Sequence, residues 1–238
     1  MATPDVVADL APTGTLRASI NLGNPVLAQG TPEQPTGITV DLARELARRL
    51  DVPLELLCFD AARKSFAAMA EGRADLCFLA IDPAREEEVA FSPAYVVIEG
   101  VYAVPRDSPL RTVADVDRPG HRIGVKQGSA YDLSLTRTLA HAEVVRGAEG
   151  LDVFREEGLE VGAGIREPVT AAVAGDAGLR LIDEAFMQIR QAVGVRRDRR
   201  PASVDFLAAV VTELLASGFV TDALRRAGQS EDLAAPQP

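Results

Sequence analysis

The sequence predicts an α/β protein made of two units, with two crossings of the chain between them. Apolar segments that suit buried parallel strands alternate with helical patterns from residue 16 onward. A polar stretch bounded by prolines, residues 105–109, interrupts this alternation, and the pattern starts again at residue 122. Residues 188–195 then have the composition of a strand that leads back to the first unit. This order of elements predicts two open α/β units.

The two expected units are discontinuous in the sequence. The first consists of residues 1–104 and 194–238, and the second consists of residues 105–193. With 238 residues, 47% of them hydrophobic, the chain is long enough to bury a core in one large domain or in two small units. The last ten residues are polar and contain proline, so we expect them to fray.

Periodic apolar residues define the elements of the first unit. Leu42, Leu46 and Leu50 recur every four residues and predict the buried face of a helix that Thr39 caps. A shorter helix ends at Gly72, a residue type common just after helix C-termini. The expected strands are 16–22, 53–59, 74–81 and 96–104, and the shorter helix is expected at 65–71.

The second unit repeats the alternation, and the chain then ends in helices. Phe206, Val210 and Leu214 form the apolar face of a helix that Gly218 ends. The expected helices are 130–140, 151–157, 203–216 and 222–227, and the expected strands are 122–125, 143–146, 159–163, 179–182 and 188–195.

Charge and composition argue against several classes of protein. The net charge of −10 and the pI near 4.8 argue against nucleic-acid binding, because phosphate requires a basic surface. No apolar run reaches the ~18 residues that a bilayer requires, so we expect no membrane insertion. The N-terminus lacks the basic region, apolar stretch and cleavage site of a signal peptide. Either a leader has been removed, or Met1 is the native start and the protein stays in the cytoplasm.

Cysteine and histidine usage predicts neither a metal site nor a cofactor. Cys58 and Cys77 each lie in an apolar segment, so we expect core thiols; a disulfide requires the two strands to lie side by side. The histidines are His121 and His141, and the sequence has no Cys-x-x-Cys motif.

Two sets of residues have the chemistry to bind an anion. Gly128, Ser129 and Ala130 lie between an expected strand and a helix start, where backbone N–H groups and the helix dipole favour negative charge. The alternative is that Gly128 only makes a tight turn and Ser129 only caps the helix. Arg85 offers two parallel donors to a carboxylate. The alternative is that Arg85 is a surface arginine that pairs with the glutamates at 86–88.

Three segments in order resemble motifs of the family 3 bacterial solute-binding proteins, the polar amino-acid-binding components of ABC importers. The segments are residues 37–42 (Gly-x-x-x-Asp-Leu), residues 74–95, and residues 122–131. The resemblance runs from about residue 16 to residue 227. It implies a two-lobed, type II periplasmic-binding-protein-like fold with two hinge crossings that closes on a small carboxylate. It also implies an ABC permease as partner and a periplasmic location, and we expect a monomer.

The resemblance implies roles for residues of the first lobe. Arg85 corresponds to the arginine that clamps the ligand's α-carboxylate, although the connection from Asp75 is shorter than usual. Ala80 and Asp82 stand where hydroxyl residues are common. Asn21 and Asn24 fall in a loop that contributes to the cleft, and amides suit a neutral polar part of a ligand. An asparagine-rich turn explains these two residues equally well.

The second lobe departs from the amino-acid-binding pattern. Residues 160–168 resemble the strand and turn that carry an acidic residue for the ligand's ammonium, and Ile165 stands at that position. An apolar side chain cannot compensate an ammonium group. Either Glu167, next to Arg166, or Asp82 replaces the acid, or the ligand lacks an α-amino group. Tyr131 either stacks on the ligand or packs in the core.

We expect a non-catalytic protein that binds an amino acid or a related organic acid. The sequence has no nucleophile elbow, P-loop or dinucleotide fingerprint. One alternative is a lyase, because some relatives are dehydratases of cyclic carboxylates that use an acid in the same cleft. Glu167 is then the candidate proton donor. The other alternative is a cytosolic ligand-sensing module.

Overall fold

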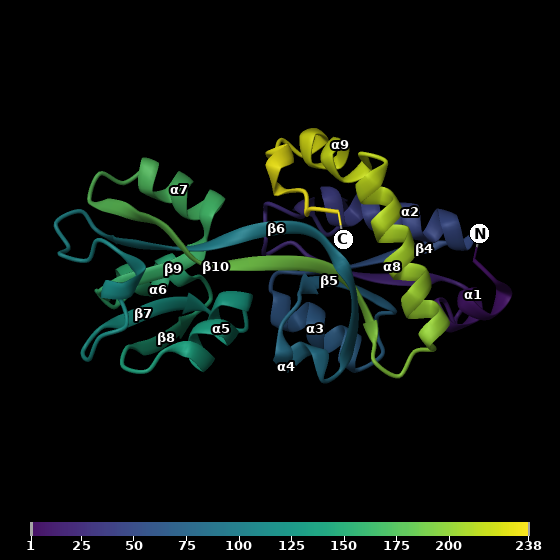
Figure 1. The fold of residues 1–238 in the computed structure, drawn as a ribbon, viewed down its shortest axis with the longest axis horizontal. Helices are drawn as coiled ribbons and strands as arrows, with labels where there is room; N and C mark the ends of the chain where they lie inside the picture. Colours follow the sequence, from purple (N-terminus) through teal and green to yellow (C-terminus); the bar gives the residue numbers. More distant parts are fainter. Residues whose placement is uncertain (1, 238) are drawn as a thin grey trace. The chain divides into compact units, whose positions relative to one another are not determined.

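The computed structural model describes residues 2–237, which divide into two compact units (Figure 1). Unit 1 contains the residues up to Val97 and those from Arg190 onward, and unit 2 runs from Ile98 to Ile189. The chain passes between the units inside two long strands, β6 (Val89–Pro105) and β10 (Leu179–Arg196), which are neighbours in the sheet. The sequence placed these boundaries after residues 104 and 193. Neither composition nor turn chemistry marks a boundary that lies inside a continuous strand.

The sheet of unit 1 is mainly parallel. Its strand order is β4 (Leu54–Phe59), β1 (Leu16–Asn21), β5 (Leu76–Ala80) and β10. β1 runs parallel to β4 and β5, and β10 runs antiparallel to β5. Every residue of β5 is buried, as expected for a strand covered on both faces. The α/β class predicted from the sequence is confirmed.

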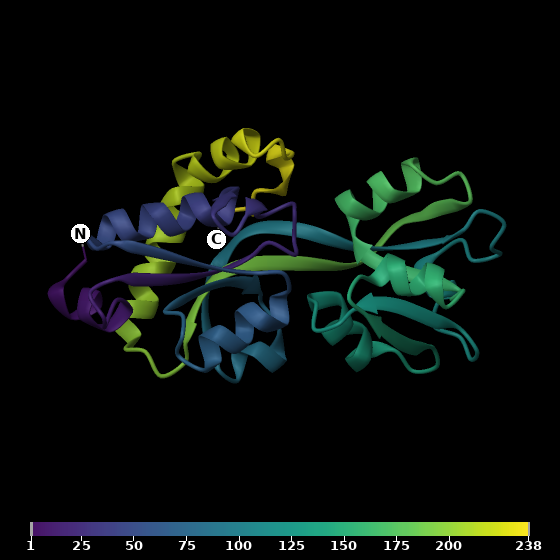
Figure 2. The same ribbon diagram turned by 180° about the vertical axis from the view of Figure 1, so that it is seen from behind.

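Helices cover both faces of this sheet. Figures 1 and 2 show α2 (Ile38–Leu50) on one face and α3 (Ala62–Ala70) on the other. The prediction that Thr39 caps α2 was wrong. Gly37 is the N-cap residue, and the Thr39 hydroxyl donates instead to the Leu27 carbonyl oxygen at 3.1 Å. The other elements of unit 1 are α1 (Pro4–Leu10), β2 (Gln29–Thr31), β3 (Gln34–Thr36), α4 (Pro83–Glu86), α8 (Pro201–Ala216) and α9 (Phe219–Arg226).

Between residues 2 and 237, no single helix has the length and apolar character needed to cross a membrane. Only when the bent pair α8 and α9 is taken together, with 71° between the two helices, are the length and the apolar composition sufficient.

Unit 2 has a mixed sheet in the order β6, β9 (Val161–Ile165), β7 (Arg122–Lys126) and β8 (Glu143–Gly147). β7 runs parallel to β8 and β9, whereas β6 runs antiparallel to β9. The helices are α5 (Ala130–Thr138), α6 (Gly150–Glu156) and α7 (Arg166–Ala174). The sequence did not predict α7, and it divided β10 into two strands.

Residues 230–235 form regular contacts, so the prediction that the last ten residues fray was wrong for this segment; residue 238 lies outside the described residues. A 3-10 helix spans Glu231–Leu233, and Ala234 forms an antiparallel bridge with Val96 of β6. The next residue, Ala235, is buried, and its N–H donates to the Tyr95 carbonyl oxygen at 3.0 Å. A contact with a strand far away in the sequence leaves no local signal in the composition.

The two cysteines lie on strands that are not adjacent. Cys58 on β4 pairs in register with Ile20, and Cys77 on β5 pairs with Ser19, so β1 separates them. Both are free thiols, with Cys77 buried and Cys58 half-buried.

The start of α6 lies directly on the backbone of two strands of unit 2. A Cβ atom on Gly150 would come within 2.4 Å of the Ala163 carbonyl oxygen on β9 and 3.1 Å of the Gly124 carbonyl oxygen on β7. Backbone atoms of packed strands cannot move aside cheaply. Glycine at residue 150 therefore allows the close packing of α6 on β7 and β9.

We expect Gly150→Ala to lower the free energy of unfolding by about 1–3 kcal/mol, because the added methyl group overpacks this contact. Urea denaturation measures the effect. Gly175→Ala is the matched control, since Gly175 has φ −85° and its Cβ would find atoms only at 3.7 Å. Equal stability of Gly150→Ala and the unchanged protein would contradict the prediction.

Candidate functional site

In unit 1, the predicted site residues lie at one edge of the sheet. β1 and β5 are parallel neighbours, and they end at Asn21 and Ala80 respectively. Ligands of open α/β sheets bind outside the carboxyl ends of such strands. The predicted residues that follow these two strand ends are Asn21, Asn24, Ala80, Asp82 and Arg85.

Arg85 is a buried cation held by the turn after β5. The Asp82 carboxylate caps α4 by accepting the Ala84 N–H at 2.9 Å. Arg85 Nη1 donates to the Ala80 carbonyl oxygen at 3.0 Å, and only 3% of Arg85 is exposed. Burial lowers the pKa of Arg85, and the nearby Asp82 charge opposes this shift without cancelling it. Arg85 is therefore not the surface arginine of the alternative interpretation.

Asn21 and Asn24 shape the loop after β1. The Asn21 side-chain oxygen accepts the Gly23 N–H at 3.1 Å, and that of Asn24 accepts the Val26 N–H at 3.2 Å. Asn24 is buried, whereas Asn21 is half-buried. These bonds use the amide oxygens and leave the –NH₂ groups pointing to no described acceptor. The turn role is present, and a role in ligand binding stays a prediction.

In unit 2, the turn before α5 is already occupied by a carboxylate of the chain. Gly128 has φ +71°, and its N–H donates to Asp132 Oδ2 at 2.8 Å. Ser129 Oγ accepts the Asp132 N–H at 3.1 Å and so caps α5. The N–H groups of Ala130 and Tyr131, the first two of α5, have no acceptor within residues 2–237. Two backbone N–H groups at this turn are therefore available, and the third, that of Gly128, is bound by Asp132.

Asp132 is the residue that the sequence analysis missed in this turn. It is 3% exposed and also accepts Arg146 Nε at 3.0 Å and the Thr136 hydroxyl at 3.1 Å. The spacing Ser129-x-x-Asp132 matches a capping box, which is a signal the sequence does contain. Tyr131 is buried, which raises the pKa of its hydroxyl and agrees with a packing role.

Arg166 and Glu167 begin α7, directly after β9. The Arg166 guanidinium binds the Glu99 carboxylate and donates to the Asp183 carbonyl oxygen at 2.8 Å. Arg166 therefore connects β6, α7 and β10 within unit 2. Glu167 Oε2 is buried and has no hydrogen-bond partner among the described residues. Ile165 is the N-cap residue of α7 and pairs with Gly100 of β6.

The predicted residues of unit 2 also lie at one sheet edge. β7 and β9 are parallel neighbours, and the turn at Gly128 and the start of α7 both follow their carboxyl ends. Each unit thus brings its own predicted residues together at the edge where open α/β sheets bind ligands. No group of three or more metal-ligating side chains occurs in the described part of the chain.

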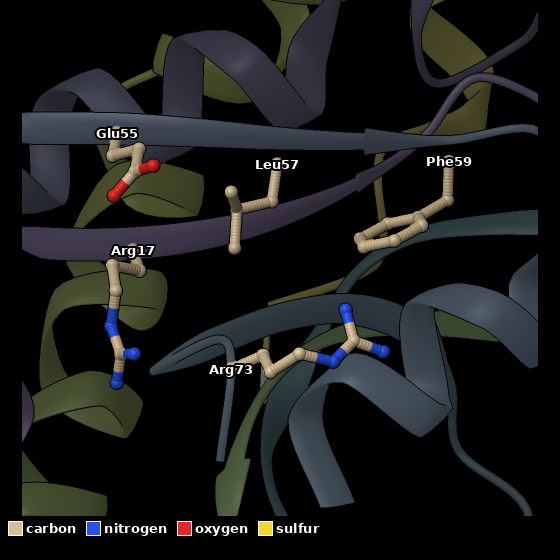
Figure 3. Close-up of a pocket in the computed structure, with 5 residues that line it drawn as sticks. All are labelled: Arg17, Glu55, Leu57, Phe59 and Arg73. Atoms are coloured by element: carbon tan, nitrogen blue, oxygen red, sulfur yellow. The ribbon is translucent and has the colours of Figure 1, made fainter. Parts of the chain in front are cut away.

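A separate hollow of about 310 Å³ lies in unit 1 and contains none of the predicted residues. Figure 3 shows its lining residues, which are Arg17, Glu55, Leu57, Phe59 and Arg73. Arg17 is bound by Asp75 through two hydrogen bonds, at 2.9 and 2.8 Å. Arg73 lies over the Phe59 ring, 5.9 Å from its centroid, and pairs with Glu71. Both guanidinium groups therefore have carboxylate partners, and Arg17 lies near the start of β1, away from its carboxyl end.

Comparison with protein families gives one match. The model of the bacterial extracellular solute-binding proteins, family 3, matches residues 20–228. No protein with a curated description matches the sequence.

Solved structures share the fold at low sequence identity. A P235GK mutant of ArgBP from T. maritima has a TM-score of 0.75 at 22% identity, covering 93% of this chain and 98% of its own. An amino acid ABC transporter substrate-binding protein from Streptococcus pneumoniae Canada MDR_19A, bound to L-arginine, has a TM-score of 0.75 at 17% identity, covering 98% and 100%. The ancestral amino acid-binding protein AncCDT-1, a precursor of cyclohexadienyl dehydratase, has a TM-score of 0.73 at 19% identity, covering 92% and 98%. At these identities the comparisons show the fold, and the predicted two-lobed architecture is confirmed.

We expect Asp132→Ala to lower the free energy of unfolding by about 1–3 kcal/mol, because it removes the carboxylate that accepts the Gly128 N–H and Arg146 Nε. Asp132→Asn keeps an oxygen acceptor and should lower the free energy of unfolding by less. Urea denaturation of both variants, with Ser134→Ala as a control on the same helix, measures the difference. A reversed order of the two Asp132 variants would contradict this account of the turn.

Proposed function

Because the chain belongs to the bacterial extracellular solute-binding proteins of family 3, we propose that it binds a small carboxylate, an amino acid or related organic acid, without converting it. The two units close on this ligand, because only the closed state lets the ligand contact both of them. Structural neighbours in complex with L-arginine and with lysine support a ligand of this size.

The observation that carries the proposal is the burial of Arg85. Its guanidinium lies at the carboxyl edge of β5 with 3% of the residue exposed. Burial lowers the pKa of Arg85, and the nearby Asp82 charge opposes this shift. A guanidinium at this position can bind the carboxylate of a ligand through two parallel hydrogen bonds, which are stronger than hydrogen bonds between neutral groups.

Unit 2 offers complementary donors for the same ligand. The free N–H groups of Ala130 and Tyr131 begin a helix of nine residues, where the helix dipole favours an anion. In our proposal these groups and the hydroxyl of Ser129 bind carboxylate oxygens, with Gly128 fixing the turn. Asp132 holds the turn in shape before the ligand arrives, which reduces the entropy lost on binding.

The remaining polar groups select the rest of the ligand. Ile165 cannot compensate an ammonium, so a ligand with an α-amino group depends on Glu167 or Asp82. The buried, unpartnered Oε2 of Glu167 supports the first of these, because a buried acceptor without a donor is costly. Asn21 and Asn24 would donate through their –NH₂ groups to neutral oxygens of the ligand.

Membership of the family also guides the proposal for location and partner. We propose that the protein acts as a monomer outside the cytoplasm and delivers its ligand to an ABC permease. Structural neighbours described as substrate-binding components of ABC transporters support this role.

A second candidate function rests on Glu167. One oxygen of its carboxyl group, Oε2, is buried without a hydrogen-bond partner among the described residues, and a lyase acting on a cyclic carboxylate requires a proton donor in the cleft. The structural likeness to the dehydratase precursor AncCDT-1 agrees with this alternative. Binding without turnover remains our leading proposal, because Arg166, the cation next to Glu167 in the sequence, is already paired with Glu99.

Titration calorimetry and thermal shift with amino acids, keto acids and aromatic acids test the binding proposal. We expect at least one acid to bind and to raise the melting temperature. Arg85→Met should lower the affinity for this acid by about thirtyfold or more, because a buried charge-assisted hydrogen bond is lost. Arg44→Met, which removes an exposed arginine of α2 in the same unit, should leave the affinity unchanged. If none of the acids binds, the proposal fails.

The lyase alternative is tested on the same panel of acids. Consumption of a cyclic carboxylate, measured by chromatography, would support the lyase alternative. The Glu167→Gln variant should then show no turnover while it still melts cooperatively. For the binding proposal, we expect every ligand to be recovered unchanged from the complex.

A further inference from the structure

The C-terminal segment, residues 230–235, is attached to one of the two strands that connect the units; we call it the C-terminal clasp. Ser230 Oγ accepts the Asp232 N–H at 3.3 Å and caps the 3-10 helix, and Glu231 pairs with Arg225 of α9 at 2.7 Å. Ala234 then bridges Val96 of β6. Figure 1 shows the yellow end of the chain beside β6. The clasp is therefore anchored at one end by α9 and at the other by β6.

The clasp contacts β6 immediately before the chain leaves unit 1. Its contacts are with Tyr95 and Val96, and the boundary between the units falls between Val97 and Ile98. Within unit 1, β6 follows β10 as the last strand of the sheet order, so its outer edge has no other strand. Unpaired backbone groups on such an edge are free to move and to bind other strands. The clasp fixes this edge at the last residues before the crossing.

On the other side of the crossing, an aromatic stack holds the same two strands together. The Phe186 ring of β10 stacks on Tyr102 of β6, with ring centroids 4.2 Å apart and planes at 18°. A Cβ atom on Gly100 would come within 2.8 Å of this ring, so the ring lies directly over the backbone at residue 100. One residue earlier, the Glu99 carboxylate is bound by Arg166 of α7, so β6 is fixed within unit 2 from residue 99 onward.

We propose that the clasp on one side, and the Phe186 stack with the Arg166–Glu99 pair on the other, confine bending of β6 to residues 97 and 98, and that the clasp sets how readily both connecting strands bend. This inference rests on the closure proposed above, because a bend at the crossing is what moves one unit against the other. β6 and β10 are hydrogen-bonded neighbours, so loosening one of them loosens the other. The clasp is a conformational device that acts from outside the ligand site.

Hydrogen exchange measured by mass spectrometry, without any ligand, tests the proposal. Ala235→Pro removes the N–H that donates to Tyr95, and Ala234 already has ψ 130°, which a following proline permits. We expect exchange to become about tenfold faster at residues 95–98, and also at residues 188–191 of β10, which the clasp does not touch. Residues 122–147 of unit 2 should keep their protection.

Ala235→Ser is the matched control, because it keeps the N–H and should exchange as the unchanged protein does. If Ala235→Pro fails to fold, the double variant Ser230→Ala, Glu231→Gln loosens the anchor of the clasp without altering the strand, and the same result is expected from it. Faster exchange at residues 95–97 with unchanged protection at residues 188–191 would overturn the proposal, since the clasp would then only cover an edge. Because no ligand is used, this failure is distinguishable from a failure of the acid screen.

Discussion

One buried carboxylate, that of Asp75, determines where three distant segments of unit 1 meet. It accepts the backbone N–H of Arg17 at 3.0 Å, the Arg17 guanidinium at 2.9 and 2.8 Å, and Arg199 Nη2 at 3.3 Å. Removing one partner from a buried pair costs about 3–5 kcal/mol, so β1, the start of β5 and the turn after β10 stay together. The register of β1 and β5 that results ends both strands at one edge, where Asn21 and Ala80 begin the candidate site.

Elements with a simple apolar period were predictable, and elements held by distant contacts were not. Leu42, Leu46 and Leu50 are all buried, as their spacing indicated. The start of the same helix was misjudged because threonine is a common cap, whereas the backbone at Gly37 has φ +105° and approaches the Leu27 carbonyl oxygen too closely for a side chain. The order of residues 230–235 depends on β6, which lies more than a hundred residues earlier.

The position of the candidate site was predictable from residue types at strand ends, but its chemistry was not. An arginine after β5 and a glycine-serine turn after β7 stand out in the sequence. Whether such an arginine is buried depends on how α4 folds back toward Ala80, which no local pattern shows. The role of Arg166 could not be predicted either, because its partner Glu99 is 67 residues away and lies on an antiparallel strand. Short-range spacing identified the candidates, and tertiary partners decided which of them remain available.

The interleaving of the two units has a consequence for biosynthesis. Unit 2 is one uninterrupted stretch, whereas unit 1 needs residues from both sides of it. The chain is synthesised from its N-terminus, so Asp75 lacks its partner Arg199 until all of unit 2 has been made. The same is true of β5, which pairs with residues 191–194 of β10. All residues of unit 2 have been made before the last part of unit 1, so the order of synthesis favours completion of unit 2 first. During that interval the edge of β5 that later pairs with β10 is uncovered. The unfinished unit 1 is therefore the part of the nascent chain that most needs a chaperone.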